Sequence, residues 1–337
     1  MFKHLKLTRK KLVVVGLIIV AFFGGWILKK MIPDNHYIKP TVLRVNNFKF
    51  AKPLLVCNSQ PESAYPELTP LKNKLNDLIN SEKQAGNVND VSIYYQDFNS
   101  DGRLDINKDE KFHPASMGKV PVMLGIYRLA ESDSQILSQT IKIPDNMDEN
   151  AGQEIKPSDY AHPGSSYTVE QLMEKMIKYS DNNSLDALLD YVKPAVFMQL
   201  YQDLGITLPY DFEKPENFDY ITTRDISYFF RILYNSTYLT NDQSDKALEI
   251  LSQSDFKDGL VAGVPSGIAV AHKFGIERII SGDNYSGREL HDCGIVYHPT
   301  NPYLLCVMTK SSAPDVSSIE TAIKDISAAV WDFQNKR

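Results

Sequence analysis

The stretch FHPASMGK, residues 112–119, lies where a polar loop gives way to an apolar run with the three-and-four spacing of a buried helix face. Ser116 and Lys119 are three residues apart, almost one helical turn, so their side chains share one face near the first turn. A serine becomes a nucleophile when a base takes its proton, and a lysine desolvated beneath an apolar helix can be that base. The spacing alone more often indicates an N-cap serine beside a surface lysine, so the rest of the chain must decide.

The composition is that of a globular protein with a sizeable core. Of the 337 residues, 43% are hydrophobic and 23% are charged, and 18 tyrosines and 15 phenylalanines argue against disorder. The net charge is −6 without a basic stripe beyond the N-terminus, so nucleic-acid binding is not expected. Asp97 opens a stretch that resembles a calcium loop, but Lys108 stands at its twelfth position, where such a loop needs glutamate. We expect neither a metal nor another cofactor.

The N-terminus has the features of a signal anchor. Residues 1–11 carry five basic residues and no acidic one, and residues 12–28 form an uncharged apolar run. This run is at the short end for a spanning helix, and a signal-peptide core is the alternative. Because no small-residue cleavage site follows, we predict a basic cytoplasmic tail, a single-pass anchor in the cell membrane and an extracytoplasmic remainder.

The exported part begins with a proline-rich segment, residues 29–66, which we predict to be a stalk. A helix is then expected over residues 68–79 and a strand over residues 91–97, followed by a hairpin turn. Mostly helical patterns continue to residue 252. A strand is expected next, over residues 268–274. A hairpin of two strands, residues 294–297 and 303–308, and a terminal helix, residues 319–333, should follow it.

This order of elements predicts an α+β fold. The strands near both ends of the domain should join in one antiparallel sheet, flanked by the first and last helices. An all-helical domain, about residues 115–255, should be inserted between them, within a domain spanning residues 67–337. Cys293 and Cys306 flank a turn and could meet across it, but we expect small core residues rather than a disulfide.

Two further motifs follow Ser116 and Lys119. They are Ser180-Asp181-Asn182 and Lys273-Phe274-Gly275. Taken singly, the first could be a helix cap and the second an exposed charge on an edge strand. With all three in this order, over roughly residues 67–335, the chain resembles the penicillin-recognising serine hydrolases, and most closely the class A β-lactamases. In that family the three motifs line one cleft between a helical and a mixed domain.

The resemblance implies a role for each catalytic residue. Ser116 would attack a carbonyl carbon, and Lys119 would be the base or the proton relay. A neutral amine at Lys119 would need desolvation or a nearby positive charge. Ser180 would pass a proton to the leaving nitrogen.

The binding residues follow from the same resemblance. Asn182 would hydrogen-bond the amide of the substrate, and Lys273, in its motif with Gly275, would hold an anionic end. The backbone N–H groups of Ser116 and Ile276 would form the oxyanion hole.

Two departures from the family pattern concern substrate binding and the release of the acyl group. Phe274 replaces the hydroxyl residue that helps to bind the substrate carboxylate. The loop over residues 207–222 is shorter than the family's loop and lacks its glutamate motif, so Glu213 and Glu216 are the only candidates for the deacylating base. We expect acylation to be intact and deacylation to be impaired.

Three functions remain open at this point. The first is a membrane-anchored β-lactamase-like hydrolase that acts on β-lactams or related amides. The second is a penicillin-binding carboxypeptidase-like enzyme that acts on the stem peptides of peptidoglycan. The third is a non-catalytic module that binds a cell-wall ligand, which the intact serine, lysine and Ser-Asp-Asn motifs argue against.

Overall fold

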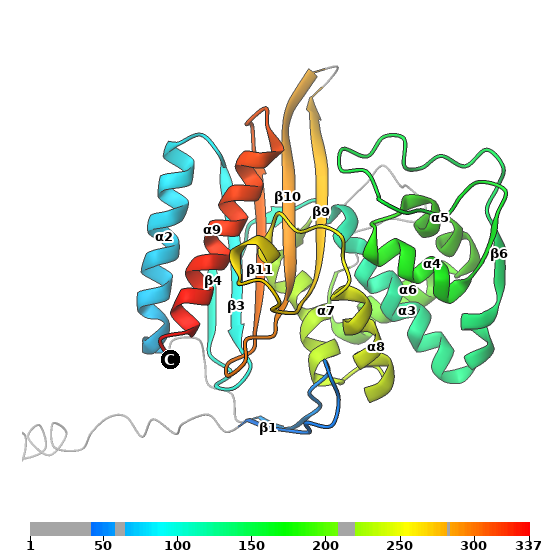
Figure 1. Cartoon of the computed structure of the whole chain (residues 1–337), viewed down its shortest axis with the longest axis horizontal. Helices are drawn as coiled ribbons and strands as arrows, with labels where there is room; N and C mark the ends of the chain where they lie inside the picture. The colour runs from blue at the N-terminus through cyan, green and yellow to red at the C-terminus, as the bar shows by residue number, and fades with distance from the viewer. Residues whose placement is uncertain (1–41, 58–64, 208–219, 282–283) are drawn as a thin grey trace, which may run out of the picture. The chain divides into compact units, whose positions relative to one another are not determined.

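The centre of the fold is a five-stranded antiparallel sheet (Figure 1). Its strands are, in spatial order, β4 (Arg103–Ile106), β3 (Asp90–Asp97), β11 (Tyr303–Ser311), β10 (Asn284–Val296) and β9 (Val270–Ser281). The N-terminal pair β3–β4 adjoins the C-terminal β11, which confirms that strands from both ends of the domain form one sheet. β9 lies at an edge, so one side of this strand has no sheet neighbour among the residues that the structure describes.

Residues 42–57, 65–207, 220–281 and 284–337 are described by the structure, a computed structural model. The predicted anchor and the loop candidates Glu213 and Glu216 lie outside these residues. Within the described ranges, no helix has both the length and the apolar character needed to cross a membrane.

Both faces of the sheet are buried. One face is covered by the first and last helices of the domain, α2 (Thr69–Gln84) and α9 (Val316–Gln334), as predicted (Figure 1). Successive side chains of a strand point to opposite faces. Along β3, Ile93 and Tyr95 therefore belong to the core under these helices, whereas Tyr94 belongs to the core shared with the helical insert.

The insert between β5 and β9 is mostly helical, which confirms the predicted architecture. Thr168 and Gln171 form the capping box that the sequence predicts at the start of one of its helices. The helices are α3 (Lys119–Ser132), α4 (Val169–Lys178), α5 (Asn182–Tyr191), α6 (Pro194–Leu204), α7 (Thr223–Asn235) and α8 (Asn241–Leu251). Short strand pairs brace them, β5 (Lys111–Phe112) with β8 (Ile221–Thr222), and β6 (Thr140–Lys142) with β7 (Ser166–Thr168).

Part of the segment predicted as a stalk is instead packed against the domain. Two strands pair antiparallel there, β1 (Val42–Arg44) and β2 (Leu54–Cys57). The Arg44 guanidinium lies 4.9 Å from the centre of the Tyr234 ring and donates to Asn235 Oδ1 at 2.6 Å. Asp245 accepts hydrogen bonds from two backbone N–H groups of the loop between the strands. For residues 42–57 the stalk prediction is wrong, because their partners are remote in the chain.

The expectation for Cys293 and Cys306 is also wrong. The register of β10 and β11 places them directly opposite each other with Cα atoms 3.9 Å apart, and they form a disulfide. The sequence predicts the hairpin but not its register, and a shift of one residue would have sent the two side chains to different faces.

This disulfide predicts a thiol count. The chain has three cysteines, so the protein denatured without reductant should show one titratable thiol, that of Cys57. After reduction it should show three. A thiol-reactive dye in guanidinium chloride makes the measurement, and three thiols before reduction would contradict the pairing.

Candidate active site

Ser116 lies in a single 3₁₀ turn, η3 (Ala115–Gly118), which leads directly into α3. The sequence predicts Ser116 at the N-terminus of a helix, near its first turn, and the residue lies in the 3₁₀ turn directly before α3. Ala115 has φ 47°, in the left-handed region that a residue with a Cβ rarely adopts. Such strain persists only where surrounding contacts over-determine the backbone.

Two buried side chains of β10 supply those contacts. The carboxylate of Glu289 accepts the His113 N–H at 2.7 Å, and His291 Nε2 contacts the His113 carbonyl oxygen at 3.0 Å. The Ala115 N–H in turn donates to His113 Nδ1 at 3.1 Å. Glu289 and His291 thus hold the segment that leads into Ser116, and no local pattern in the sequence reveals them.

Lys119 is buried at the start of α3. Its Nζ lies 2.5 Å from the Ser180 carbonyl oxygen, 3.1 Å from Ser180 Oγ and 2.7 Å from Asn182 Oδ1, and a neutral amine can donate to two of these three atoms. Burial and the positive charge of Lys273 hold the pKa of Lys119 well below its usual range, and Asp181 offsets this only partly. A neutral amine is the form that a general base needs.

Ser180 stands between two lysines. Lys273 Nζ donates to its Oγ at 3.0 Å, opposite the Lys119 contact, and also to the Phe274 carbonyl oxygen at 2.9 Å. Burial lowers the pKa of Lys273 to about 7, although the charges of Asp292 and Asp255 oppose this shift. Ser180 Oγ can accept hydrogen bonds from Lys119 and Lys273 at the same time. Its hydroxyl proton is then available for a hydrogen bond to another group in the pocket.

Asp181 is the residue of its motif that acts as a helix cap. Its carboxylate accepts hydrogen bonds from the backbone N–H groups of Asn183 and Ser184 at the start of α5, and from Asn150 Nδ2 at 2.7 Å. The helix-cap interpretation of this motif is therefore confirmed for Asp181. The cap fixes the turn from which Ser180 and Asn182 reach the lysine.

The edge strand β9 approaches Ser116 at Gly275. A Cβ at this position would lie 3.1 Å from the backbone nitrogens of both Ser116 and Met117, so glycine permits the close approach. The Phe274 ring is buried and stacks on Phe256, with ring centres 4.3 Å apart. The aromatic residue therefore fills the core beside Lys273, whose Nζ lies 4.1 Å from the centre of its ring.

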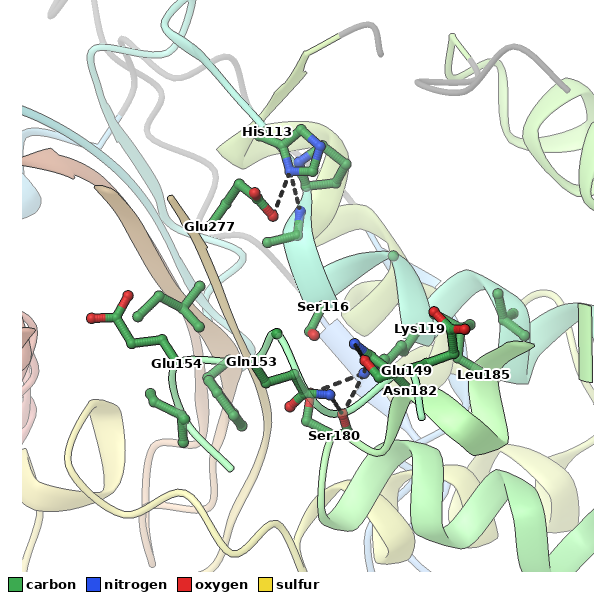
Figure 2. A pocket seen from close by; sticks show the side chains of 18 of the residues that line it. His113, Ser116, Lys119, Glu149, Gln153, Glu154, Ser180, Asn182, Leu185 and Glu277 are labelled. Carbon is green, nitrogen blue, oxygen red and sulfur yellow. Dashed lines mark hydrogen bonds and ion pairs between the residues drawn. The ribbon is translucent and has the colours of Figure 1, made fainter. Parts of the chain in front are cut away.

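These residues surround a pocket of about 730 Å³ (Figure 2). Ser116, Lys119, Ser180, Asn182 and Ile276, all predicted from the sequence, contribute to its lining, and Lys273 lies directly behind Ser180. In Figure 2, Ser116 faces the group formed by Lys119, Ser180 and Asn182. Within the described residues, no hydrogen bond joins Lys119 to Ser116.

One polar loop over the pocket was missed by the sequence analysis. Gln153 Nε2 donates to the Ser180 carbonyl oxygen at 3.2 Å and to Asn150 Oδ1 at 2.9 Å. Asn150 Oδ1 also accepts the Asn182 N–H. The loop belongs to the polar connection after α3, which has no periodicity that could reveal such contacts. In the described part of the chain, no group of three or more metal-ligating side chains is placed to hold an ion.

A serine at the start of a helix, a buried lysine with a lowered pKa and a second serine held between two lysines are the groups that a serine acyl-transfer hydrolase needs. The chain belongs to the Beta-lactamase enzyme family, whose model matches residues 70–334. It is a β-lactamase-like serine hydrolase. No curated protein matches the sequence.

Solved structures share the fold. PBP-A is 21% identical with a TM-score of 0.66, over 80% of this chain and 97% of that one. A class A β-lactamase from Mycobacterium abscessus is 21% identical with a TM-score of 0.65, over 79% and 99% of the two chains. A variant of PBP-A, solved as an acyl-enzyme complex with penicillin G, is 20% identical with a TM-score of 0.65, over 79% and 98%.

Proposed function

We propose that the protein is a membrane-anchored, extracytoplasmic hydrolase that forms an acyl-enzyme through Ser116 with a β-lactam or a related amide. The observation that carries the proposal is the convergence of Lys119 and Lys273 on Ser180 Oγ. This arrangement supplies both a base for the attack and a proton for the leaving nitrogen.

The reaction balances with the residues present. Ser116 Oγ attacks the carbonyl carbon, and its proton passes to the neutral Lys119 amine. The oxyanion is held by the Ser116 and Ile276 N–H groups. The C–N bond then breaks, the Ser180 hydroxyl protonates the leaving nitrogen, and the Lys119 ammonium returns a proton to Ser180. The ammonium of Lys273 holds the carboxylate of the substrate.

The second candidate is a penicillin-binding enzyme with a carboxypeptidase-like action on peptidoglycan stem peptides. It uses the same acylation step, and the absence of a hydroxyl at Phe274 together with the short loop favours it. The non-catalytic alternative is disfavoured, because a lysine buried at a cost in free energy has no evident use in a passive binding cleft.

The membrane anchor is proposed from the basic tail and the apolar run of residues 12–28. A protease-protection assay on intact cells tests it. Cleavage of the hydrolase domain by external protease, once any outer barrier is opened, is the expected result. Protection of this domain until the membrane is lysed would overturn the export proposal.

The enzymatic proposal is tested with the full-length protein in detergent. It is mixed with a fluorescent penicillin and with a chromogenic cephalosporin, and the adduct is followed by intact mass. A long-lived adduct that is lost in Ser116→Ala is the expected result and supports the penicillin-binding form. Rapid steady turnover would support the β-lactamase form, and Glu213→Gln and Glu216→Gln would then show which glutamate activates the water. No adduct and no turnover with any β-lactam or stem peptide would refute both.

The affinity for the carboxylate of a β-lactam should depend on pH, because Lys273 binds this group as an ammonium ion. Its pKa is about 7, so the ammonium that binds an anion predominates below pH 7 and is lost as the pH rises. Binding of a β-lactam carboxylate to the Ser116→Ala protein should weaken by about tenfold per pH unit above that point. The methyl ester of the same β-lactam is the control and should show little change. Equal pH profiles for acid and ester would contradict the role of Lys273.

A further inference from the structure

A second cavity, of about 710 Å³, adjoins the catalytic pocket. His113, Glu277 and Arg278 contribute to the lining of both, so the two spaces meet along the edge strand β9. The remaining charged residues of the second cavity come from the segment before β5, from β5 itself, from β10 and from β11, and they are Asp109, Glu110, Lys111, Glu289 and Lys310.

Two glutamates face each other in the wall of this cavity. Glu277 of β9 and Glu289 of β10 are directly opposite in the register of the sheet, an arrangement in which like charges repel. In the next pair of the register, Arg278 lies opposite Arg288, so two like charges again face each other. There the Glu154 carboxylate contacts the two guanidinium groups, at 3.2 Å and 3.0 Å. Among the residues that the structure describes, no lysine or arginine bridges the two glutamates in the same way.

Two histidines lie beside this pair. One is His291, whose Nε2 lies 3.4 Å from Glu289 Oε2 and whose Nδ1 accepts the Thr309 N–H, and the other is His113. His113 Nδ1 lies 3.8 Å from Glu277 Oε2 (Figure 2). Burial lowers the pKa of His113, and its Nδ1 accepts the Ala115 N–H, so the ring is neutral. Burial, with the charge of Glu289 as a smaller cause, raises the pKa of Glu277, which is the direction expected for a carboxyl group without a cation.

Two cations of the cavity wall, Lys310 and Arg278, are engaged elsewhere. Among the residues that the structure describes, no ion pair joins the third, Lys111, to either glutamate. Lys310 donates to Glu110 Oε1 at 2.6 Å and to the Lys111 carbonyl oxygen at 2.7 Å. Arg278 is paired with Glu154. The position between the two glutamates is therefore suited to a cation from outside the protein.

The expected orientation of a bound substrate places its acyl group near Glu277 and Glu289. Under the proposed function, Lys273 holds the anionic end and the reacting carbonyl lies between Ser116 and Ile276. The remainder of the acyl group must leave the carbonyl on the other side, along β9 past Ile276 toward Glu277. The second cavity lies next along the strand.

We propose that Glu277 and Glu289 form a subsite for a cationic group, such as a primary amine, on the acyl part of the substrate. The inference rests on the proposed function and narrows its substrate class to amides whose acyl portion carries an amine. The ligand amine would lie between the two carboxylates, as the Glu154 carboxylate lies between the two arginines.

The test compares a penicillin that bears a primary amine on its acyl side chain with its N-acetyl derivative. The second-order rate of acylation of the full-length protein is measured by intact mass. The amine should react about tenfold faster, and Glu277→Gln should abolish most of this advantage. Glu320→Gln, on the helix α9 that covers the opposite face of the sheet, is the matched control and should retain it. An equal rate for both compounds, or an advantage that survives Glu277→Gln, would overturn the subsite.

Binding to the Ser116→Ala protein separates the subsite from the chemistry. There the amine should bind about tenfold more tightly than its acetylated form, with the preference again lost in the Glu277→Gln background. If no compound acylates the wild-type protein, the proposed function fails, and this binding preference alone decides the subsite. Absence of the preference refutes the subsite whether or not acylation occurs.

Discussion

Replacing Lys119 by methionine is expected to lower the rate of Ser116 acylation by about a thousandfold at pH 7. The side chain is buried, and its Nζ lies within hydrogen-bonding distance of Ser180 and Asn182. Methionine fills a similar volume but has no nitrogen to accept the serine proton. The measurement is the second-order rate of adduct formation with a fluorescent penicillin, together with the unfolding temperature of each variant.

Lys119→Arg is the informative control. Arginine keeps the positive charge and the donors but does not lose its proton at accessible pH. If Lys119 acts as a base, the arginine variant should be as slow as the methionine variant. A folded Lys119→Arg protein with close to wild-type acylation would show that the residue acts by its charge alone.

Replacing Asp181 by alanine is expected to lower the free energy of unfolding by about 3 kcal/mol and to slow acylation more than tenfold. The carboxylate is fully buried and accepts hydrogen bonds from Asn150, from the Ala161 N–H and from the first turn of α5. Its loss leaves these donors without an acceptor. It also releases the turn that holds Ser180 and Asn182.

Urea unfolding and adduct formation measure the two effects. Asp190→Ala, an exposed position on the same helix, is the matched control and should change the free energy of unfolding by less than about 0.5 kcal/mol. If Asp181→Ala were as stable and as reactive as this control, the cap would have no part in positioning the site.

The elements that the sequence predicted correctly are those with a local signal. Alternating apolar residues predict β3, and the motif order around Ser116, Ser180 and Lys273 predicts which side chains meet. Within a strand or helix, the period of the apolar residues decides which face is buried, and this information is present in a few consecutive residues.

The features that escaped prediction are contacts between distant segments. Glu289 and His291 hold the loop before Ser116 from a strand more than a hundred residues away in sequence, at separations of 176 and 178 residues from His113. Arg44 reaches Asn235 across a separation of 191 residues. Such pairs follow no period, so they become visible only when the backbone is folded.

The bond between Cys293 and Cys306 carries information about the route by which the protein matures. Thiols in the cytoplasm are kept reduced, whereas paired cysteines persist in oxidising surroundings. A chain that folded in reducing surroundings would keep these two sulfurs as thiols within a core from which oxidants are excluded, since both are completely buried. Finding this pair oxidised in protein isolated from its native source, with free thiols blocked at lysis, would therefore indicate that the hairpin closed in an oxidising compartment.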